Sequence, residues 1–268
     1  MSRFAAVAGR FYPDDPIALK KVLARLVPAV RPSEKLNALA VILPHAGYIY
    51  SGATAGKTIS KVQVPQTVVM LGPNHYGLGA SVALATQDWD MPMRKIPVEQ
   101  EFCRLLFDSC EEIKASDIAH EKEHSLEVQL PFLHFCRPDV RIVPLSISHI
   151  PYTACVQIAQ ALAQAVKSWP QPVLLVASTD MTHYTSRKQA AKQDQLAIDR
   201  ILEIDPEGLF STVSDNDISM CGVLPVTITL LAVKYLGATQ VKLVEYTDSG
   251  AVSGDTDQVV GYAGLIVN

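Results

Sequence analysis

The sequence lacks any block of like charges. Its 268 residues include 23 basic and 27 acidic side chains, which gives a net charge of −4. A protein that binds nucleic acid electrostatically, or that lies on a membrane surface, carries a basic stripe or a basic amphipathic helix. The even mixture of charges therefore argues against both a nucleic-acid partner and a membrane partner.

The sequence also lacks the features of exported and membrane-spanning proteins. No apolar run approaches the roughly 18 residues that cross a bilayer, and the apolar stretch between Arg3 and Arg10 is too short for a signal-peptide core. The five cysteines are odd in number and form no Cys-x-x-Cys pair, which argues against a disulfide framework. We therefore expect a cytoplasmic protein in a reducing compartment.

Hydrophobic residues, by contrast, are abundant. They make up 49% of the chain, which is enough for a sizeable core. α/β proteins of this length commonly form one domain, and no repeat, low-complexity tract or long linker interrupts the sequence. We expect residues 1–268 to form a single domain.

Short apolar runs alternate with amphipathic segments along the chain. Runs at residues 39–43, 67–71 and 173–177 are typical of buried strands, and residues 51–61 form a helical segment between the first two. Further helices are expected at residues 97–112, 123–135, 152–169, 187–203 and 222–235, and further strands at residues 140–147, 241–246 and 261–267. This alternation predicts an α/β fold with a mainly parallel central sheet and helices on both faces.

Histidines follow the three clearest buried strands. His45 comes after the first, His75 after the second and His183 after the third. Open α/β sheets bind ligands beyond the carboxyl ends of their strands, and neutral imidazole is the commonest metal ligand in proteins. A single histidine here is more often a hydrogen-bonded structural residue, but the repetition favours a shared site for His45 and His75.

The segment Glu-His-Ser-Leu-Glu opens the helix expected at residues 123–135. Glu123 and Glu127 are four residues apart, and His124 and Glu127 are three apart, so each pair would share one helical face. Two interpretations stay open. The segment either contributes to the site or is a solvated first turn whose carboxylates face the helix dipole.

Cys221 differs from the other cysteines in its position. It directly precedes Gly222 and the apolar segment expected to be helical. A helix N-terminus lowers the pKa of a thiol and favours the thiolate, which binds metals or attacks electrophiles. From this position alone, a core role and a functional role are equally open. The other four are interpreted as small core residues of apolar helices: Cys103, Cys110, Cys136 and Cys155.

Seven motifs occur in the same order in a known family. They are VAGRFYP (residues 7–13), PHAGY (44–48) with YSG (50–52), LGPNH (71–75), EHSLE (123–127) with LP (130–131), STD (178–180) with His183, MCG (220–222) and GYAG (261–264). Each motif alone is unspecific, but all seven in order over nearly the whole chain are specific. The sequence resembles the Memo family, whose prokaryotic members are called AmmeMemoRadiSam system protein B.

The resemblance implies a fold similar to that of the class III, non-haem-iron extradiol dioxygenases. It also implies one transition-metal ion, iron or copper, with zinc as an alternative, bound by His45, His75 and Cys221. The dioxygenases use two histidines and a carboxylate, whereas a thiolate shifts preference toward Cu(I), zinc or thiolate-ligated iron. Ring cleavage is therefore not carried over to this chain.

Four further residues are expected to act in the same pocket: His183, Asp180, His124 and Glu123. His183 would be the general base. Asp180 would orient it or accept a hydrogen bond from a metal-bound histidine. Tyr48 and Asn74, which lie within the motifs, are candidate ligand-binding residues.

Three functions stay open on the sequence. The first is a metal-dependent redox enzyme acting on an unknown small substrate. The second is a binding module that captures a peptide or small ligand in a dioxygenase-like pocket without turnover. The third is a zinc hydrolase whose metal-bound water is the nucleophile. The family name further implies a pathway link to a radical-SAM protein and an AMMECR-type domain.

Overall fold

Four buried apolar strands form the centre of the main sheet. β2 (Ala40–Leu43), β9 (Val173–Ser178), β3 (Thr67–Pro73) and β8 (Arg141–Ile147) lie side by side in this order, and all their pairings are parallel. The computed structural model describes residues 2–268. Aliphatic side chains cover both faces of these strands, as expected where helices bury a parallel sheet on both sides.

The flanking strands make the sheet mixed. β12 (Val259–Val267) pairs antiparallel with β2, β10 (His183–Thr185) and β11 (Val241–Asp248). At the opposite side, β4 (Val82–Leu84) pairs antiparallel with β8 and is followed by β7 (Lys114–Ala115). The predicted α/β class is confirmed. Outside the four central strands the flanking pairings are antiparallel, except that of β4 with β7. β11 and β12 run antiparallel because their short connection contains no long crossover helix.

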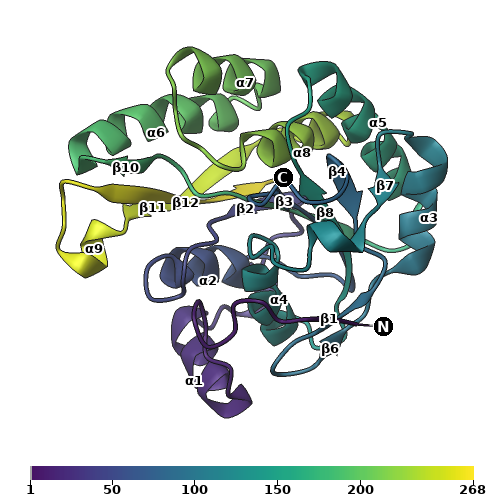
Figure 1. The fold of residues 1–268 in the computed structure, drawn as a ribbon, viewed down its shortest axis with the longest axis horizontal. Helices are drawn as coiled ribbons and strands as arrows, with labels where there is room; N and C mark the ends of the chain where they lie inside the picture. Colours follow the sequence, from purple (N-terminus) through teal and green to yellow (C-terminus); the bar gives the residue numbers. More distant parts are fainter. Residues whose placement is uncertain (1) are drawn as a thin grey trace.

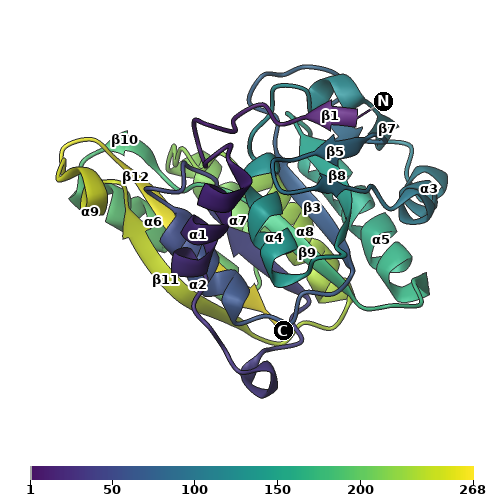
Figure 2. The same cartoon turned by 90° about the horizontal axis from the view of Figure 1, so that it is seen from below.

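Two layers of helices cover the sheet (Figure 1). The first layer consists of α1 (Pro16–Leu26), α2 (Gly52–Ser60) and α4 (Leu130–Cys136), which lie in front of the sheet in Figure 2. The second layer consists of α5 (Tyr152–Ser168), α6 (Arg187–Leu202), α7 (Pro206–Asp215) and α8 (Val223–Tyr235). α8 is apolar on all sides because it packs between the sheet and its neighbours α5 and α7.

Smaller elements complete the fold. β1 (Ser2–Phe4), β5 (Asp88–Asp90) and β6 (Lys95–Ile96) form a separate small sheet, and α3 (Gln100–Ser109) packs beside α5. The short helices are α9 (Gly250–Ser253), η1 (Pro32–Glu34), η2 (Asp117–Ala119) and η3 (Glu127–Gln129). Among the helices of residues 2–268, none has the length and apolarity that crossing a bilayer requires.

The helix expected at residues 123–135 is shorter than predicted. A 3-10 turn begins at Glu127 and the α-helix at Leu130, whereas residues 123–126 are not helical. The carboxylate of Glu123 accepts hydrogen bonds from the backbone N–H groups of His124 and Ser125, which replaces helical bonding there. Pro131 lies in the first turn of α4, where a missing N–H costs nothing.

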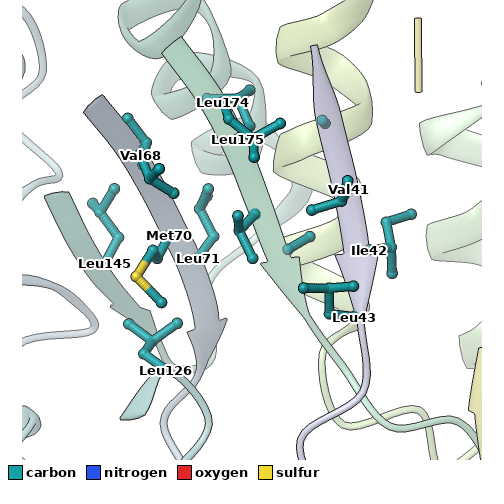
Figure 3. Packing of buried hydrophobic residues seen from close by; sticks show 14 of the residues in the cluster. Val41, Ile42, Leu43, Val68, Met70, Leu71, Leu126, Leu145, Leu174 and Leu175 are labelled. Atoms are coloured by element: carbon teal, nitrogen blue, oxygen red, sulfur yellow. The ribbon is translucent and has the colours of Figure 1, made fainter. Parts of the chain in front are cut away.

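The non-helical segment at residues 123–126 packs against the sheet through Leu126. Figure 3 shows Leu126 beside Met70 of β3 and Leu145 of β8, and all three side chains are buried. A Cβ atom on Gly72 would lie only 2.7 Å from Cδ2 of Leu126 and 2.8 Å from Oγ of Ser125. Glycine at this position therefore lets residues 123–126 approach the end of β3, where His75 follows.

Candidate metal centre

His45, His75 and Cys221 meet at the carboxyl edge of the parallel strands. His45 follows β2 and His75 follows β3, and both strands pair with β9. One ligand atom from each of the three residues lies within 4.8 Å of the other two. The sulfur of Cys221 is 3.3 Å from Nε2 of His45, and the two imidazole centroids are 5.3 Å apart. The structure thus brings together the three residues expected to hold a metal.

His45 is held at two points. Its backbone N–H donates to Oδ1 of Asp180 at 2.7 Å, and its Nδ1 lies 2.9 Å from Oγ of Ser178. Burial, reinforced by the neighbouring histidines, lowers the pKa of His45 well below its ordinary value, so the ring is neutral. With Nδ1 engaged, Nε2 is the nitrogen that faces Cys221.

Glu123 orients His75. Oε2 of Glu123 accepts the backbone N–H of His75 at 2.7 Å, and Oε1 lies 2.9 Å from Nδ1 of the same residue. Burial opposes ionisation, but the hydrogen bonds from His75 and from the N–H of Ser125 hold the pKa of Glu123 at about 2. An ionised carboxylate only accepts, so it fixes the proton of His75 on Nδ1 and leaves Nε2 for a metal.

A second group of possible ligands, His75, Glu123 and His124, also has its atoms within 4.8 Å of one another. A metal there would compete with the hydrogen bonds that the Glu123 carboxylate accepts from His75, His124 and Ser125. The first group is therefore the better candidate. Glu123, expected among the catalytic residues, holds His75 through two hydrogen bonds, and its catalytic role stays a prediction.

His124 lies beside the candidate ligands His45 and His75. Its ring stacks on His75 with centroids 4.7 Å apart and packs against Phe11 at 4.8 Å. Burial lowers the pKa of His124 to about 4, so the imidazole is neutral near neutral pH. The structure therefore places His124 next to the expected metal ligands, as an uncharged group.

Cys221 reaches the site because the chain passes very close to the end of β9. A Cβ atom on Gly222 would lie 2.5 Å from the carbonyl oxygen of Ser178 and 2.5 Å from Cβ of Thr179. Burial, followed by the charge of Asp180, raises the pKa of the Cys221 thiol, so the lowering predicted from the helix N-terminus is wrong. A coordinated metal ion reverses this effect, because a coordinating thiol is deprotonated.

Asp180 contacts two of the candidate ligands, His45 and Cys221, and His183 lies close to the same group. Nδ1 of His183 is 2.9 Å from the carbonyl oxygen of Ser219, which can only accept, so Nδ1 carries the proton and Nε2 carries the basic lone pair. Burial lowers the pKa of His183 and raises that of Asp180 to about 7. Asp180 accepts a hydrogen bond from the candidate metal ligand His45, which is one of its two expected roles, and the donor is the backbone N–H of that residue.

A family comparison identifies the chain. The model of the family described as "Memo-like protein" matches residues 3–266. The chain belongs to the Memo family. A MEMO1 family protein of Methanopyrus kandleri is 38% identical over 279 residues, covering 99% of both chains. One of Aquifex aeolicus is 36% identical over 266 residues, covering 98% of both chains.

The Memo-family fold also resembles a solved structure. The crystal structure of an uncharacterized protein from Escherichia coli K12 matches with a TM-score of 0.53 and 15% sequence identity. The match covers 83% of this chain and 98% of the other. At this identity the likeness shows a shared fold.

Two candidate ligand-binding residues of this Memo-family chain have structural roles. The hydroxyl of Tyr48 donates to the carbonyl of Val128 at 2.7 Å, and its ring packs against Phe132, so its polar tip faces the core. The amide of Asn74 donates to the carbonyl of Leu78 at 2.8 Å and closes its own loop. These hydrogen bonds give both residues a structural role, and the expectation that they bind a ligand stays a prediction.

Sequence reasoning missed the residues that orient the imidazoles. Ser178 contacts Nδ1 of His45, Gln129 contacts Ser178, and the carbonyl of Ser219 contacts Nδ1 of His183. Ser178 and Gln129 are fully buried. The available signal was a polar residue within an apolar stretch, which predicts a buried hydrogen-bonded group but not its partner.

Proposed function

We propose that this Memo-family chain is a metal-dependent redox protein whose metal ion is bound by His45, His75 and Cys221. The observation that carries the proposal is the meeting of these three ligand atoms within 4.8 Å. Two of these ligand atoms belong to the imidazoles of His45 and His75. Nδ1 of His45 already contacts Ser178, and Nδ1 of His75 already contacts Glu123. Such preorganised rings, each presenting Nε2, are characteristic of metal-binding histidines.

The donor set favours a soft or borderline transition metal. Two imidazoles and one thiolate suit copper, zinc or thiolate-ligated iron. Three protein ligands also leave a coordination position for a small substrate, as catalytic sites require. When bound, iron or copper would supply one-electron chemistry at this position.

The surrounding residues would contribute proton transfer and uncharged neighbours. His183 presents the lone pair of Nε2 and would accept a proton from a bound substrate. His124 stacks beside the candidate ligands as an uncharged ring, and Phe11 packs against it. The buried carboxyl group of Asp180, whose pKa is about 7, would exchange a proton near neutral pH.

Metal analysis of the chain purified without chelators tests the proposal. We expect about one iron or copper ion per chain, lost in His45→Ala and in Cys221→Ser. Cys136→Ser is the matched control, because Cys136 is also a half-buried free cysteine but lies at the end of α4. Zinc alone would favour the hydrolase instead, and a chain without affinity for any transition metal would refute the metal centre.

A binding module is the second candidate, and exposed tyrosines favour it. Tyr76 and Tyr184 follow His75 and His183 directly and are 53% and 75% exposed. Tyrosine rings give large contact area with a polar tip. Turnover that depends on His183 would exclude this candidate. Ligand binding that survives loss of the metal in His45→Ala would favour it.

A further inference from the structure

We infer that Gln129 acts through Ser178 to fix the proton of His45 on Nδ1, which makes Gln129 a positioning residue of the proposed metal centre. The consequence for metal binding rests on the proposed function, whereas the position of the proton does not. The inference follows from counting the hydrogens that each buried group can donate.

The orientation of the Gln129 amide is determined by a carbonyl group. Its Nε2 lies 2.9 Å from the carbonyl oxygen of Pro44 and 2.9 Å from Oγ of Ser178. A carbonyl only accepts, so the amide nitrogen must face Pro44. The opposite orientation would place Oε1 of Gln129 against that oxygen. Both hydrogens of Nε2 are thus donated, one to Pro44 and one to Ser178.

Ser178 has one hydrogen to donate and three polar neighbours. Its hydroxyl donates to the carbonyl oxygen of Ser125 at 2.6 Å and accepts from Gln129. The third neighbour is Nδ1 of His45 at 2.9 Å. Because the only hydroxyl hydrogen is used on Ser125, His45 must be the donor in this contact.

The proton on Nδ1 determines which atom His45 presents to Cys221. Nε2 then carries the lone pair, and it lies 3.3 Å from the sulfur of Cys221. A metal binds the unprotonated nitrogen of a neutral imidazole. Ser125 and Gln129 together fix the rotamer of the Ser178 hydroxyl. Without the Gln129 donor only the Ser125 carbonyl holds this hydroxyl, so in part of the molecules it turns and donates to Nδ1, which moves the imidazole proton to Nε2 and blocks the metal ligand.

Nitrogen NMR of the metal-free, full-length chain measures this proton directly. We expect His45 to be the Nδ1–H tautomer in the wild type. Gln129→Met and Ser178→Ala interrupt the relay at two different points, and each should increase the population of the Nε2–H tautomer. Ser146→Ala is the matched control, since Ser146 is equally buried but lies in β8, and its Oγ has no hydrogen-bond partner within residues 2–268.

Titration with Co²⁺ provides a second measurement on the same variants. Loss of a residue that orients a metal-bound histidine typically weakens binding by about 10- to 100-fold, and we expect this range for Gln129→Met and Ser178→Ala but not for Ser146→Ala. An Nε2–H tautomer in the wild type, or an unchanged tautomer in both relay variants, would overturn the inference. The predicted tautomers without Co²⁺ binding would support the relay and refute the proposed function.

Discussion

The sulfur of Cys221 lies 3.3 Å from Nε2 of His45, although 176 residues separate them in the chain. The contact depends on two features of the backbone. β2 and β9 pair in parallel, so the residues that follow them share one sheet edge. Gly222 then lets the segment before α8 approach the end of β9. The same features determine where changes to the chain should affect the site.

Replacing Glu123 by glutamine should weaken both the fold and the metal centre. The carboxylate accepts hydrogen bonds from His75, His124 and Ser125, and an amide would direct its own hydrogens at some of these donors. We expect a loss of about 1–3 kcal/mol in unfolding free energy and about 10- to 100-fold weaker metal binding. Urea denaturation and Co²⁺ titration measure these effects. Glu121→Gln, at an exposed position, is the control, and equal behaviour of the two variants would contradict the assigned role.

Gly222→Ala should displace Cys221. The added Cβ would lie 2.5 Å from the carbonyl oxygen of Ser178, so the backbone must shift. We expect loss of the thiolate-to-cobalt absorption band and a stability loss of about 1–3 kcal/mol from overpacking. Gly47→Ala adds the same methyl group near the site, where its nearest neighbour is 3.7 Å away. A cobalt spectrum of Gly222→Ala that matches that of Gly47→Ala would count against the close-approach argument.

Glu127→Gln should destabilise the chain strongly. Glu127 and Arg3 form a buried ion pair with a 2.7 Å contact, and Glu127 also accepts from the hydroxyl of Tyr12. Glutamine leaves the Arg3 charge buried without its partner, which costs about 3–5 kcal/mol. Denaturation in urea measures this cost. The exposed pair Arg31–Glu34 provides the comparison, since Glu34→Gln should cost less than about 1 kcal/mol. Similar costs for the two variants would contradict the prediction.

The stability of the metal-free chain should fall in acid partly because of His120. Burial lowers the pKa of His120 from 6.5 to about 4, so between these values the unfolded chain binds a proton that the folded chain excludes. The lost stability grows as the pH falls through this window and reaches about 3 kcal/mol. His120→Gln keeps a donor for the carbonyl of Ala83, which His120 contacts through Nε2 at 3.0 Å. Its stability should fall less steeply with pH, and an unchanged slope would refute the assignment.

The sequence predicted the histidine part of the site for a physical reason. Buried apolar runs identify parallel strands, and the residues after such strands share an edge, so the approach of His45 and His75 follows from local pattern alone. The prediction that Cys221 is the third metal ligand came only from the family resemblance. The place of Cys221 depends on how the start of α8 packs against β9, and this tertiary contact has no local signal.

The helix predicted to begin at residue 123 begins later because a side chain competes with the backbone for hydrogen bonds. Residues 123–126 have helical periodicity, but the Glu123 carboxylate accepts hydrogen bonds from the backbone N–H groups of His124 and Ser125. The relay from Gln129 to Ser178 was also beyond prediction, because its members come from three segments that meet only in the folded chain. A buried glutamine is visible in a sequence, whereas the atom that it contacts is not.

X-ray absorption at the zinc edge of the Zn²⁺-loaded chain tests the central claim most directly. We expect one sulfur at about 2.3 Å and nitrogens at about 2.0–2.1 Å from the metal. The sulfur signal should disappear in Cys221→Ser and persist in Cys136→Ser. A wild-type spectrum without sulfur, or a sulfur signal that survives in Cys221→Ser, would contradict a metal bound by His45, His75 and Cys221.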